Sequence, residues 1–181
     1  MAGALSGLEE VNLLVTHLPV WGGRRLALED LRTALRGRVR LVASHFNVLL
    51  LSVDYEDPLE AVEDLRRGLP RDTVVLRAIP VHRIVAPPEV EDVARVVKEI
   101  LSRAPPGSFA VRLEGRLLRE GREISRDEAV KVLADPVDRP VNLSNPDILV
   151  LVKRFRLKRL VGAAIYVGPP RGVLSTAKGE L

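Results

Sequence analysis

A stiff turn followed by two apolar segments constrains the fold of this chain more than any other feature. The turn is S-N-P-D at residues 144–147, and the apolar segments follow at residues 148–152 and 160–167. Asn and Asp side chains bond to nearby backbone and Pro fixes φ, so this tetrapeptide predicts a rigid turn. A continuous run of Leu and β-branched residues predicts a strand that is buried on both faces. The pattern therefore predicts two core strands joined as a hairpin.

A cationic segment separates these two predicted strands. It places five cations within seven positions, namely Lys153, Arg154, Arg156, Lys158 and Arg159. These charges repel one another, so the cluster is stable at a hairpin end in water and more stable against phosphate. A solvated turn without a ligand is the alternative. We favour phosphate contact because no acidic residue balances the run.

The charge is unevenly distributed along the chain, whose formal net charge is +4. Residues 1–90 carry 11 basic and 12 acidic side chains, whereas residues 91–181 carry 17 and 12. A basic half beside a near-neutral half indicates a polyanionic partner on one side of the protein. Arg-rich chains that bind no nucleic acid share this bias, so the charge alone does not decide the function.

Composition excludes several classes of protein. The chain has no Cys, which excludes disulfides, thiol catalysis and a zinc–thiolate site. Gln is absent, the one Met is the first residue and Arg greatly outnumbers Lys, which suggests the cytoplasm of a thermophile. No apolar run approaches the roughly 20 residues that span a bilayer, and the first residues lack the pattern of a signal peptide. We therefore expect a soluble, cytoplasmic protein that binds no membrane.

The first half of the chain predicts a ferredoxin-like domain over residues 1–80, so the fold class is α/β of the α+β type. β-Branched runs predict four strands, and helical spacing of apolar residues predicts two helices. In chain order these are strand 11–17, helix 24–35, strands 39–43 and 48–53, helix 58–67 and strand 73–79. This βαββαβ order is a split pair of βαβ units that closes its own sheet.

The second half predicts another α/β domain over residues 81–168. Ser125 and Glu128 form a capping box that begins a helix ending near residue 134. The turn and the two strands described above complete the domain. The segment from Gly168 contains two Pro and three Gly, so residues 169–181 are predicted to be a flexible tail. Before Ser125 we expect an extended linker at 81–88, a helix at 89–102, a strand at 108–113 and a polar loop at 114–123.

Three features of this second half occur together in one known family. They are the strand F-A-V-R at 109–112 followed by Arg116, the capped helix at Ser125, and V-N-L-S-N-P-D at 141–147. Together they resemble a THUMP domain, an RNA-binding module found beside several tRNA-modifying enzymes. Members of this family usually have V-D-L-x-N-P-D where this chain has V-N-L-S-N-P-D at 141–147. Asn142 replaces that Asp, and its amide oxygen still accepts hydrogen bonds. The structural motif comprises Asn142, Ser144, Asn145, Pro146 and Asp147.

Within the family the chain is most similar to stand-alone members, which lack a catalytic domain. Those proteins are accessory to N4-acetylcytidine formation in tRNA. The resemblance implies a non-catalytic adaptor without cofactor or small-molecule substrate. It implies binding near the acceptor stem of tRNA, while a separate acetyltransferase performs the chemistry. The alternative is a protein-interaction subunit of an RNA-processing complex with little RNA affinity of its own.

The candidate RNA-binding residues are the cations of this second half. Shape and backbone recognition is the better hypothesis, because the sequence lacks neighbouring aromatic residues on central strands. Intramolecular pairing with Glu114, Glu120 and Glu123 is an equal alternative for the Arg residues at 112–122. The candidates are Arg112, Arg116, Arg119, Arg122, Lys131, Arg139, Lys153, Arg154, Arg156, Lys158 and Arg159.

No pattern in the sequence indicates a catalytic or metal site. His17, His45 and His82 lie on separate predicted elements without metal-ligand spacing. Neither a G-x-G-x-x-G motif nor a P-loop is present. Phe155 lies within the cationic segment and is the one candidate for stacking on a base, although core packing is the favoured role. A small hydrolase or transferase has almost no support from motifs.

Overall fold

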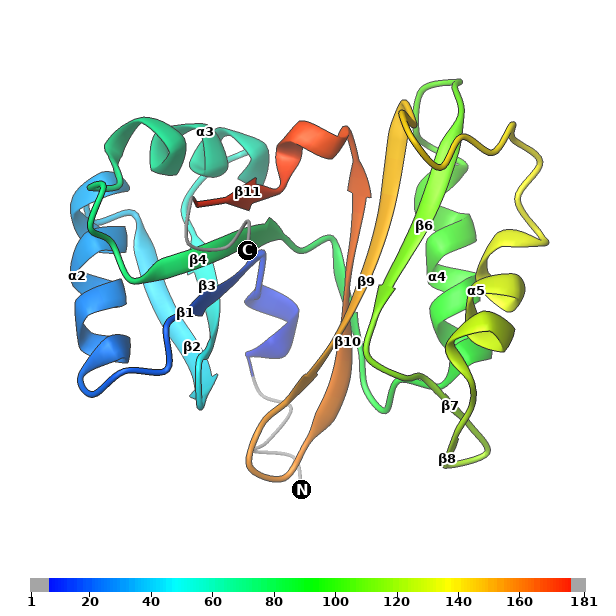
Figure 1. The fold of residues 1–181 in the computed structure, drawn as a ribbon, viewed down its shortest axis with the longest axis horizontal. Coiled ribbons are helices and arrows are strands. Elements are labelled where there is room, and N and C mark those ends of the chain that lie inside the picture. Colours follow the sequence, from blue (N-terminus) through cyan, green and yellow to red (C-terminus); the bar gives the residue numbers. More distant parts are fainter. Residues whose placement is uncertain (1–6, 177–181) are drawn as a thin grey trace. The chain divides into compact units, whose positions relative to one another are not determined.

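The computed structural model describes residues 7–176, which form two compact units (Figure 1). The first unit contains residues 7–81 and 171–176, and the second contains residues 82–170. No helix in the described residues is long and apolar enough to cross a membrane.

The first unit is an antiparallel sheet covered on one face by two helices. Its strands follow the order β11-β4-β1-β3-β2, and all neighbouring strands are antiparallel. Leu28 and Leu31 of one helix and Leu65 of the other pack in one cluster with Leu13 and Leu51 of the sheet. The elements are η1 (Leu8–Glu10), β1 (Leu13–His17), α2 (Gly23–Ala34), β2 (Val39–His45), β3 (Val48–Val53), α3 (Pro58–Gly68), β4 (Val75–Pro80) and β11 (Leu174–Ser175). From β1 to β4 they follow the predicted βαββαβ order. The short helix η2 (Pro170–Gly172) begins at the last residue of the second unit and continues into the first.

The second unit is a mixed sheet with two helices. Its strands follow the order β5-β10-β9-β6, in which β6 and β9 are parallel and the other neighbours are antiparallel. The residues of α4 and α5 that face the sheet, including Val93, Val97 and Leu133, pack against Val150 and Ile165. The elements are β5 (Arg83–Val85), α4 (Val90–Leu101), β6 (Phe109–Glu114), β7 (Leu118–Arg119), β8 (Arg122–Glu123), α5 (Arg126–Ala134), β9 (Ile148–Arg156) and β10 (Val161–Gly168).

The predicted capping box begins helix α5. The Ser125 hydroxyl accepts a hydrogen bond from the Glu128 amide over 3.2 Å, as an N-cap does. The Glu128 carboxylate does not return to Ser125 but accepts from Arg119. The helix therefore starts at the predicted residue. The second hydrogen bond of the capping box is replaced by the hydrogen bond between Glu128 and Arg119.

Two predicted loops contain short strands. The linker 81–88 includes β5, whose Ile84 lies opposite Ala164 of β10, and the loop 114–123 includes the hairpin of β7 and β8. Both predictions were wrong for the same reason. Each strand is at most three residues long, so its partner rather than its own apolar pattern stabilises it.

The prediction of a flexible tail over 169–181 was wrong for its described part. Residues 170–172 form η2, and Leu174 pairs with Ala78 of β4 as part of the edge strand β11. Leu174 is only 7% exposed and packs in the core of the first unit. The Thr176 amide donates a hydrogen bond of 2.9 Å to the Leu76 carbonyl. Residues 177–181 lie outside the described residues.

Replacing Leu174 with Ala should lower the free energy of unfolding by about 2–4 kcal/mol, because it removes a buried side chain from the core. Replacing the exposed neighbour Arg171 with Ala should change it by about 0.5 kcal/mol or less. Chemical denaturation of both variants, followed by circular dichroism, measures the difference. Equal stability of the two variants would show that this segment does not contribute to the fold.

Candidate nucleic-acid interface

The S-N-P-D turn fixes the start of the parallel pair β6 and β9. Asp147 Oδ2 accepts from the Ser108 amide over 2.9 Å and from the Ser108 hydroxyl over 3.1 Å. The Ser108 hydroxyl also lies 3.1 Å from the Asp147 amide, and the Ile148 amide donates to the Ser108 carbonyl over 3.0 Å. These contacts join the residues just before β6 and β9, so they set the register that follows.

Asn142 organises the same turn through its amide oxygen. Asn142 Oδ1 accepts from the Asn145 amide over 3.0 Å, and from the amide and hydroxyl of Ser144 over 3.3 and 3.2 Å. All three groups are donors, so a carboxylate oxygen would accept from them equally well. The Asn in place of the expected Asp therefore preserves the turn, and the motif residues lie at the amino ends of β6 and β9.

Because β6 and β9 are parallel, their carboxyl ends lie together at the end of the sheet opposite the S-N-P-D turn. The register runs from Phe109 opposite Ile148 to Glu114 opposite Lys153. Gly115 follows β6 with φ of +90°, and a Cβ built there would lie 2.7 Å from the Cβ of Arg154. Only glycine fits this backbone and this approach. The chain after β6 therefore passes directly beside the end of β9.

The sequence predicted that the cationic segment would lie at a hairpin turn, but only its last part forms the turn. Strand β9 continues to Arg156, and the turn is closed by a hydrogen bond of 2.7 Å from the Leu157 amide to the Leu160 carbonyl. The strand continues because Phe155 is buried, at 3% exposure, and lies opposite Gly162 of β10. Lys153 and Arg154 therefore point to opposite faces of the sheet, whereas Arg154 and Arg156 share one face.

Two of the predicted cations have carboxylate partners. Lys153 Nζ lies 3.1 Å from Glu114 Oε2, its neighbour across the parallel pair, and both side chains are largely buried. Arg154 donates over 2.8 Å to Glu123 Oε1 and over 2.9 Å to the carbonyl of Arg116. Arg154 thus ties the β7–β8 hairpin to the end of β9. Its charge is partly neutralised, and its RNA contact stays a prediction.

Two further candidates hold the unit together. Arg119 donates to Glu91 of α4 over 2.8 Å and to Glu128 of α5 over 2.6 Å, and the hydrogen bond to Glu91 raises the pKa of Arg119 most. Arg139 donates to the carbonyls of Leu101, Ala104 and Pro105 at the end of α4. Cations favour the carboxyl end of a helix. The geometry accounts for both residues without a ligand.

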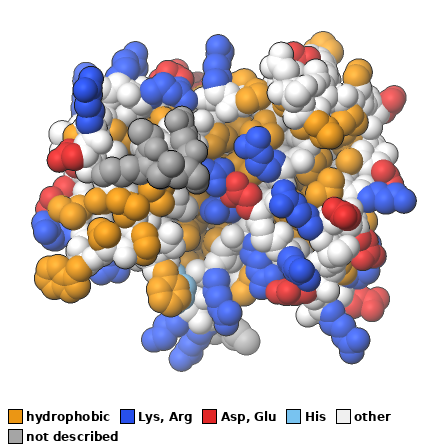
Figure 2. All heavy atoms as spheres, in the orientation of Figure 1, with side chains coloured by type: hydrophobic (Ala, Val, Ile, Leu, Met, Phe, Trp, Pro, Cys, Tyr) orange, Lys and Arg blue, Asp and Glu red, His pale blue; other side chains and the backbone are white. Residues whose placement is uncertain are grey.

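Five exposed candidates remain without a carboxylate partner among the described residues, and we call them the strand-end surface. Two come from the segment 115–123, which Arg154 holds against β9, and three come from the end of β9 and its turn. Figure 1 draws both hairpins at the same end of the second unit, and Figure 2 shows Lys and Arg side chains around the tip of the β9–β10 hairpin. The five residues are Arg116, Arg122, Arg156, Lys158 and Arg159.

The last two candidates lie outside the strand-end surface. Arg112 is exposed in the middle of β6, opposite Leu151, and Lys131 is exposed on α5. The acidic side chains of Glu120 and Glu123 are exposed in the β7–β8 hairpin, so this hairpin carries both signs of charge. Among the described residues no group of three or more His, Asp or Glu residues is placed to hold a metal ion.

The comparison with known proteins shows similarity in fold. No protein-family model and no curated protein matches the sequence. PH1313 from Pyrococcus horikoshii Ot3 matches with a TM-score of 0.57 and 15% identity, over 88% of this chain and 55% of that chain. TrmN from Thermus thermophilus matches with a TM-score of 0.52 and 16% identity, over 84% and 44%. A 4-thiouridine synthetase in complex with RNA and ATP matches with a TM-score of 0.50 and 15% identity, over 88% and 42%.

These similarities extend across both units, and they support a THUMP-like fold. At this level of identity they show the fold alone. The chain spans about half the length of the solved structures that it matches.

Asn142→Asp should leave the free energy of unfolding within about 0.5 kcal/mol of the original, because a carboxylate accepts the same three hydrogen bonds. Asn142→Val has a similar volume but no acceptor, and should lower it by about 1–2 kcal/mol. Thermal and chemical denaturation of both variants test this pair. A destabilised Asp variant would mean that the turn requires the amide nitrogen of Asn142.

Proposed function

We propose that this protein binds tRNA through the strand-end surface and presents it to a separate modifying enzyme. The resemblance of the second half to stand-alone THUMP proteins supports tRNA as the RNA. The same resemblance supports an N4-acetylcytidine acetyltransferase as the partner and a non-catalytic role for this chain. The RNA in the complex of the similar 4-thiouridine synthetase is consistent with RNA binding by this fold.

The observation that carries the proposal is the strand-end surface itself. It comprises five exposed cations, two from the segment 115–123 and three from the end of β9 and its turn, and none is neutralised by a carboxylate of the described chain. Guanidinium and ammonium groups placed in this way bind phosphate oxygens and release counterions from the RNA. Four of the five are Arg, and Lys158 and Arg159 lie in the β9–β10 turn.

Recognition by this unit rests on the RNA backbone. Its three aromatic side chains, Phe109, Phe155 and Tyr166, are each at most 3% exposed. Phe155 in particular is buried, so the second unit offers no exposed Phe, Tyr or Trp ring to an unstacked base. A surface of this kind reads the shape and phosphate spacing of RNA rather than its base sequence.

Replacing Arg156 and Arg159 with Glu should weaken tRNA binding at low salt by about ten- to a hundred-fold, because two phosphate contacts become repulsive. The slope of the logarithm of affinity against the logarithm of salt concentration should fall by about one for each lost contact. Filter binding across a salt series measures both quantities. Arg154 is left unchanged, because its loss would also release the β7–β8 hairpin.

The matched control replaces Lys98 and Arg103 with Glu, two exposed cations of α4 and the segment after it. This variant has the same net charge but keeps the strand-end surface, and should bind tRNA almost as well as the original. Equal losses in both variants would contradict a localised site. Absence of tRNA affinity at low salt, with an enzyme still copurifying after nuclease treatment, would favour the interaction subunit instead.

Transfer RNA that lacks its 3′ single strand should bind more weakly than intact tRNA if the acceptor end is recognised. Both RNAs have nearly the same number of phosphates, so non-specific attraction predicts almost equal affinities. Competition between the two RNAs in one filter-binding experiment gives the ratio directly. Indistinguishable affinities would remove the acceptor end from the proposal while leaving RNA binding in place.

A further inference from the structure

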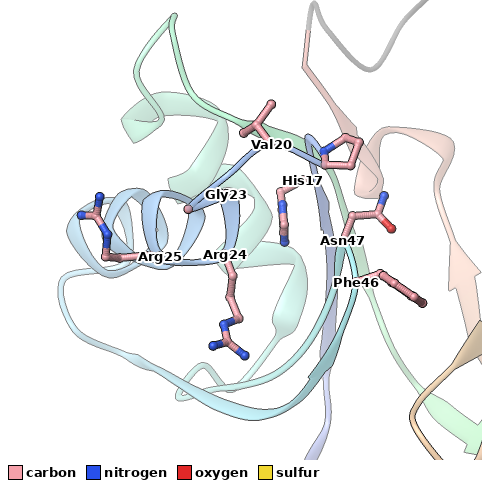
Figure 3. A pocket seen from close by; sticks show the side chains of 9 residues that line it. His17, Val20, Gly23, Arg24, Arg25, Phe46 and Asn47 are labelled. Carbon is pink, nitrogen blue, oxygen red and sulfur yellow. The ribbon is translucent and has the colours of Figure 1, made fainter.

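A cavity of about 440 Å³ lies in the first unit, between the start of α2 and the β2–β3 turn. Its lining includes His17, Arg24, Phe46 and Asn47, and none of its lining residues is acidic. Figure 3 shows His17 in the space between Arg24 on α2 and the side chains of Phe46 and Asn47. All of these residues belong to the first unit, so the cavity shares no residue with the strand-end surface.

The start of α2 carries positive charge that nothing in the described chain neutralises. The amides of Arg24 and Arg25 donate to no acceptor among the described residues, and Gly22 provides no side-chain cap. Arg25 pairs with Glu29, whereas Arg24 donates only to the neutral hydroxyl of Ser44, over 3.2 Å. The helix dipole makes this end positive, so an added cation is unfavourable until an anion binds.

His17 supplies a second, independent indication of a ligand. Its side chain is 3% exposed, and its Nε2 atom is buried without any hydrogen-bond partner. The Nδ1 atom lies 2.8 Å from the carbonyl oxygen of Leu18, which only accepts, so Nδ1 carries the hydrogen. A buried polar atom without a partner is unfavourable. A phosphate satisfies Nε2 either by donating its own proton or by accepting one from the protonated ring.

Gly23 permits the helix to start this close to His17. A Cβ at this position would lie 2.7 Å from the Leu18 carbonyl oxygen and 3.0 Å from His17 Nδ1. Any other residue would displace either the ring or the first turn of the helix. Gly23 therefore allows the buried imidazole of His17 to lie beside the uncapped amino end of α2.

Phe46 adds an aromatic surface at the rim of the cavity. It is 85% exposed, and its φ of +50° lies in the left-handed region, which bulky residues rarely adopt. Asn or Gly would fit this turn with less strain, so the ring is present despite its local conformation. Exposed aromatic rings stack on nucleobases of any sequence.

We propose that this cavity binds one unpaired nucleotide, with its phosphate at the start of α2 against Arg24 and His17 and its base on Phe46. The assignment of that nucleotide to RNA rests on the proposed function. The assignment of a phosphate and an aromatic contact rests only on the geometry of the first unit.

The single Trp of the chain, Trp21, makes the proposal directly measurable. It is 98% exposed and lies between the lining residues Val20 and Gly22. Inorganic phosphate, adenosine 5′-monophosphate and adenosine are titrated into the full chain. Trp21 fluorescence and the NMR shifts of the Arg24 and Arg25 amides are followed. We expect saturable shifts with phosphate, about ten-fold tighter binding of the monophosphate, and little binding of adenosine.

Two variants separate the contacts. Phe46→Asn suits the left-handed turn and should keep phosphate binding while losing the ten-fold preference for the monophosphate. Arg24→Gln should weaken both ligands several-fold, whereas Arg32→Gln, in the last turn of the same helix, should weaken neither. Binding of adenosine as tight as that of the monophosphate would overturn the phosphate assignment. Unchanged amide shifts with both anions would overturn the site.

Failure of this inference is distinguishable from failure of the proposed function. The Arg156→Glu/Arg159→Glu variant should bind the monophosphate as the original does, because those residues belong to the second unit. A chain that binds tRNA but not the monophosphate would overturn the cavity as a nucleotide site. A chain that binds the monophosphate without tRNA would support the cavity as a site for a free nucleotide and contradict the proposed function. A short single-stranded RNA that competes with the monophosphate would identify RNA as the source of the nucleotide.

Discussion

The parallel pairing of β6 with β9 is the constraint on which the second unit depends. Parallel neighbours require a long crossover, and residues 115–147 provide it through α5. The pairing is set at its amino end by Asp147 and Ser108. Both strands then finish at the same end of the sheet, and the chain turns away there once after β6 and once after β9. This topology places the cations that follow the two strands at the same end of the sheet, although about forty residues separate them in sequence.

The arginines of this unit serve two physical purposes that composition does not separate. Arg119, Arg139 and Arg154 each donate to acceptors on other elements, and their planar, multiply donating groups suit such bridges. The bridges of Arg119 and Arg154 occupy Glu91, Glu128 and Glu123. The cations left over, such as Arg156 and Arg159, therefore keep their full charge at the surface. The unpaired positive charge is a consequence of where the carboxylates are used.

Local interactions explain which parts of the fold the sequence predicted. The turn at Asn142 and the cap at Ser125 involve residues at most three positions apart, so their patterns are visible in sequence. The short strands β5, β7, β8 and β11 were missed because their stability comes from distant partners. Leu174, for example, pairs with Ala78, and no periodic pattern of apolar residues around Leu174 predicts that contact. The pairing of Arg119 with Glu91 was hidden for the same reason, since it depends on tertiary packing.

The candidate cavity illustrates a further limit of sequence reasoning. His17 stands at the end of an apolar strand, where a buried histidine with ordinary partners is the usual interpretation. Only the coordinates reveal that Nε2 has no partner and that a helix terminus faces the same space. Phe46 likewise occupies a turn position that is commonly polar, and its exposure was not predicted.

The two candidate sites differ in the physics of recognition. The strand-end surface provides charge without aromatic contact, so its affinity falls steeply with salt and distinguishes little between sequences. As proposed, the cavity combines one phosphate position with one ring, so its affinity would require an unstacked base. With a single phosphate contact, that affinity would depend less on salt. A double-stranded stem presents phosphates but hides its bases, whereas a single-stranded end exposes both. Under the two proposals, the strand-end surface would contact the phosphates of a stem, and the cavity would contact an unstacked base.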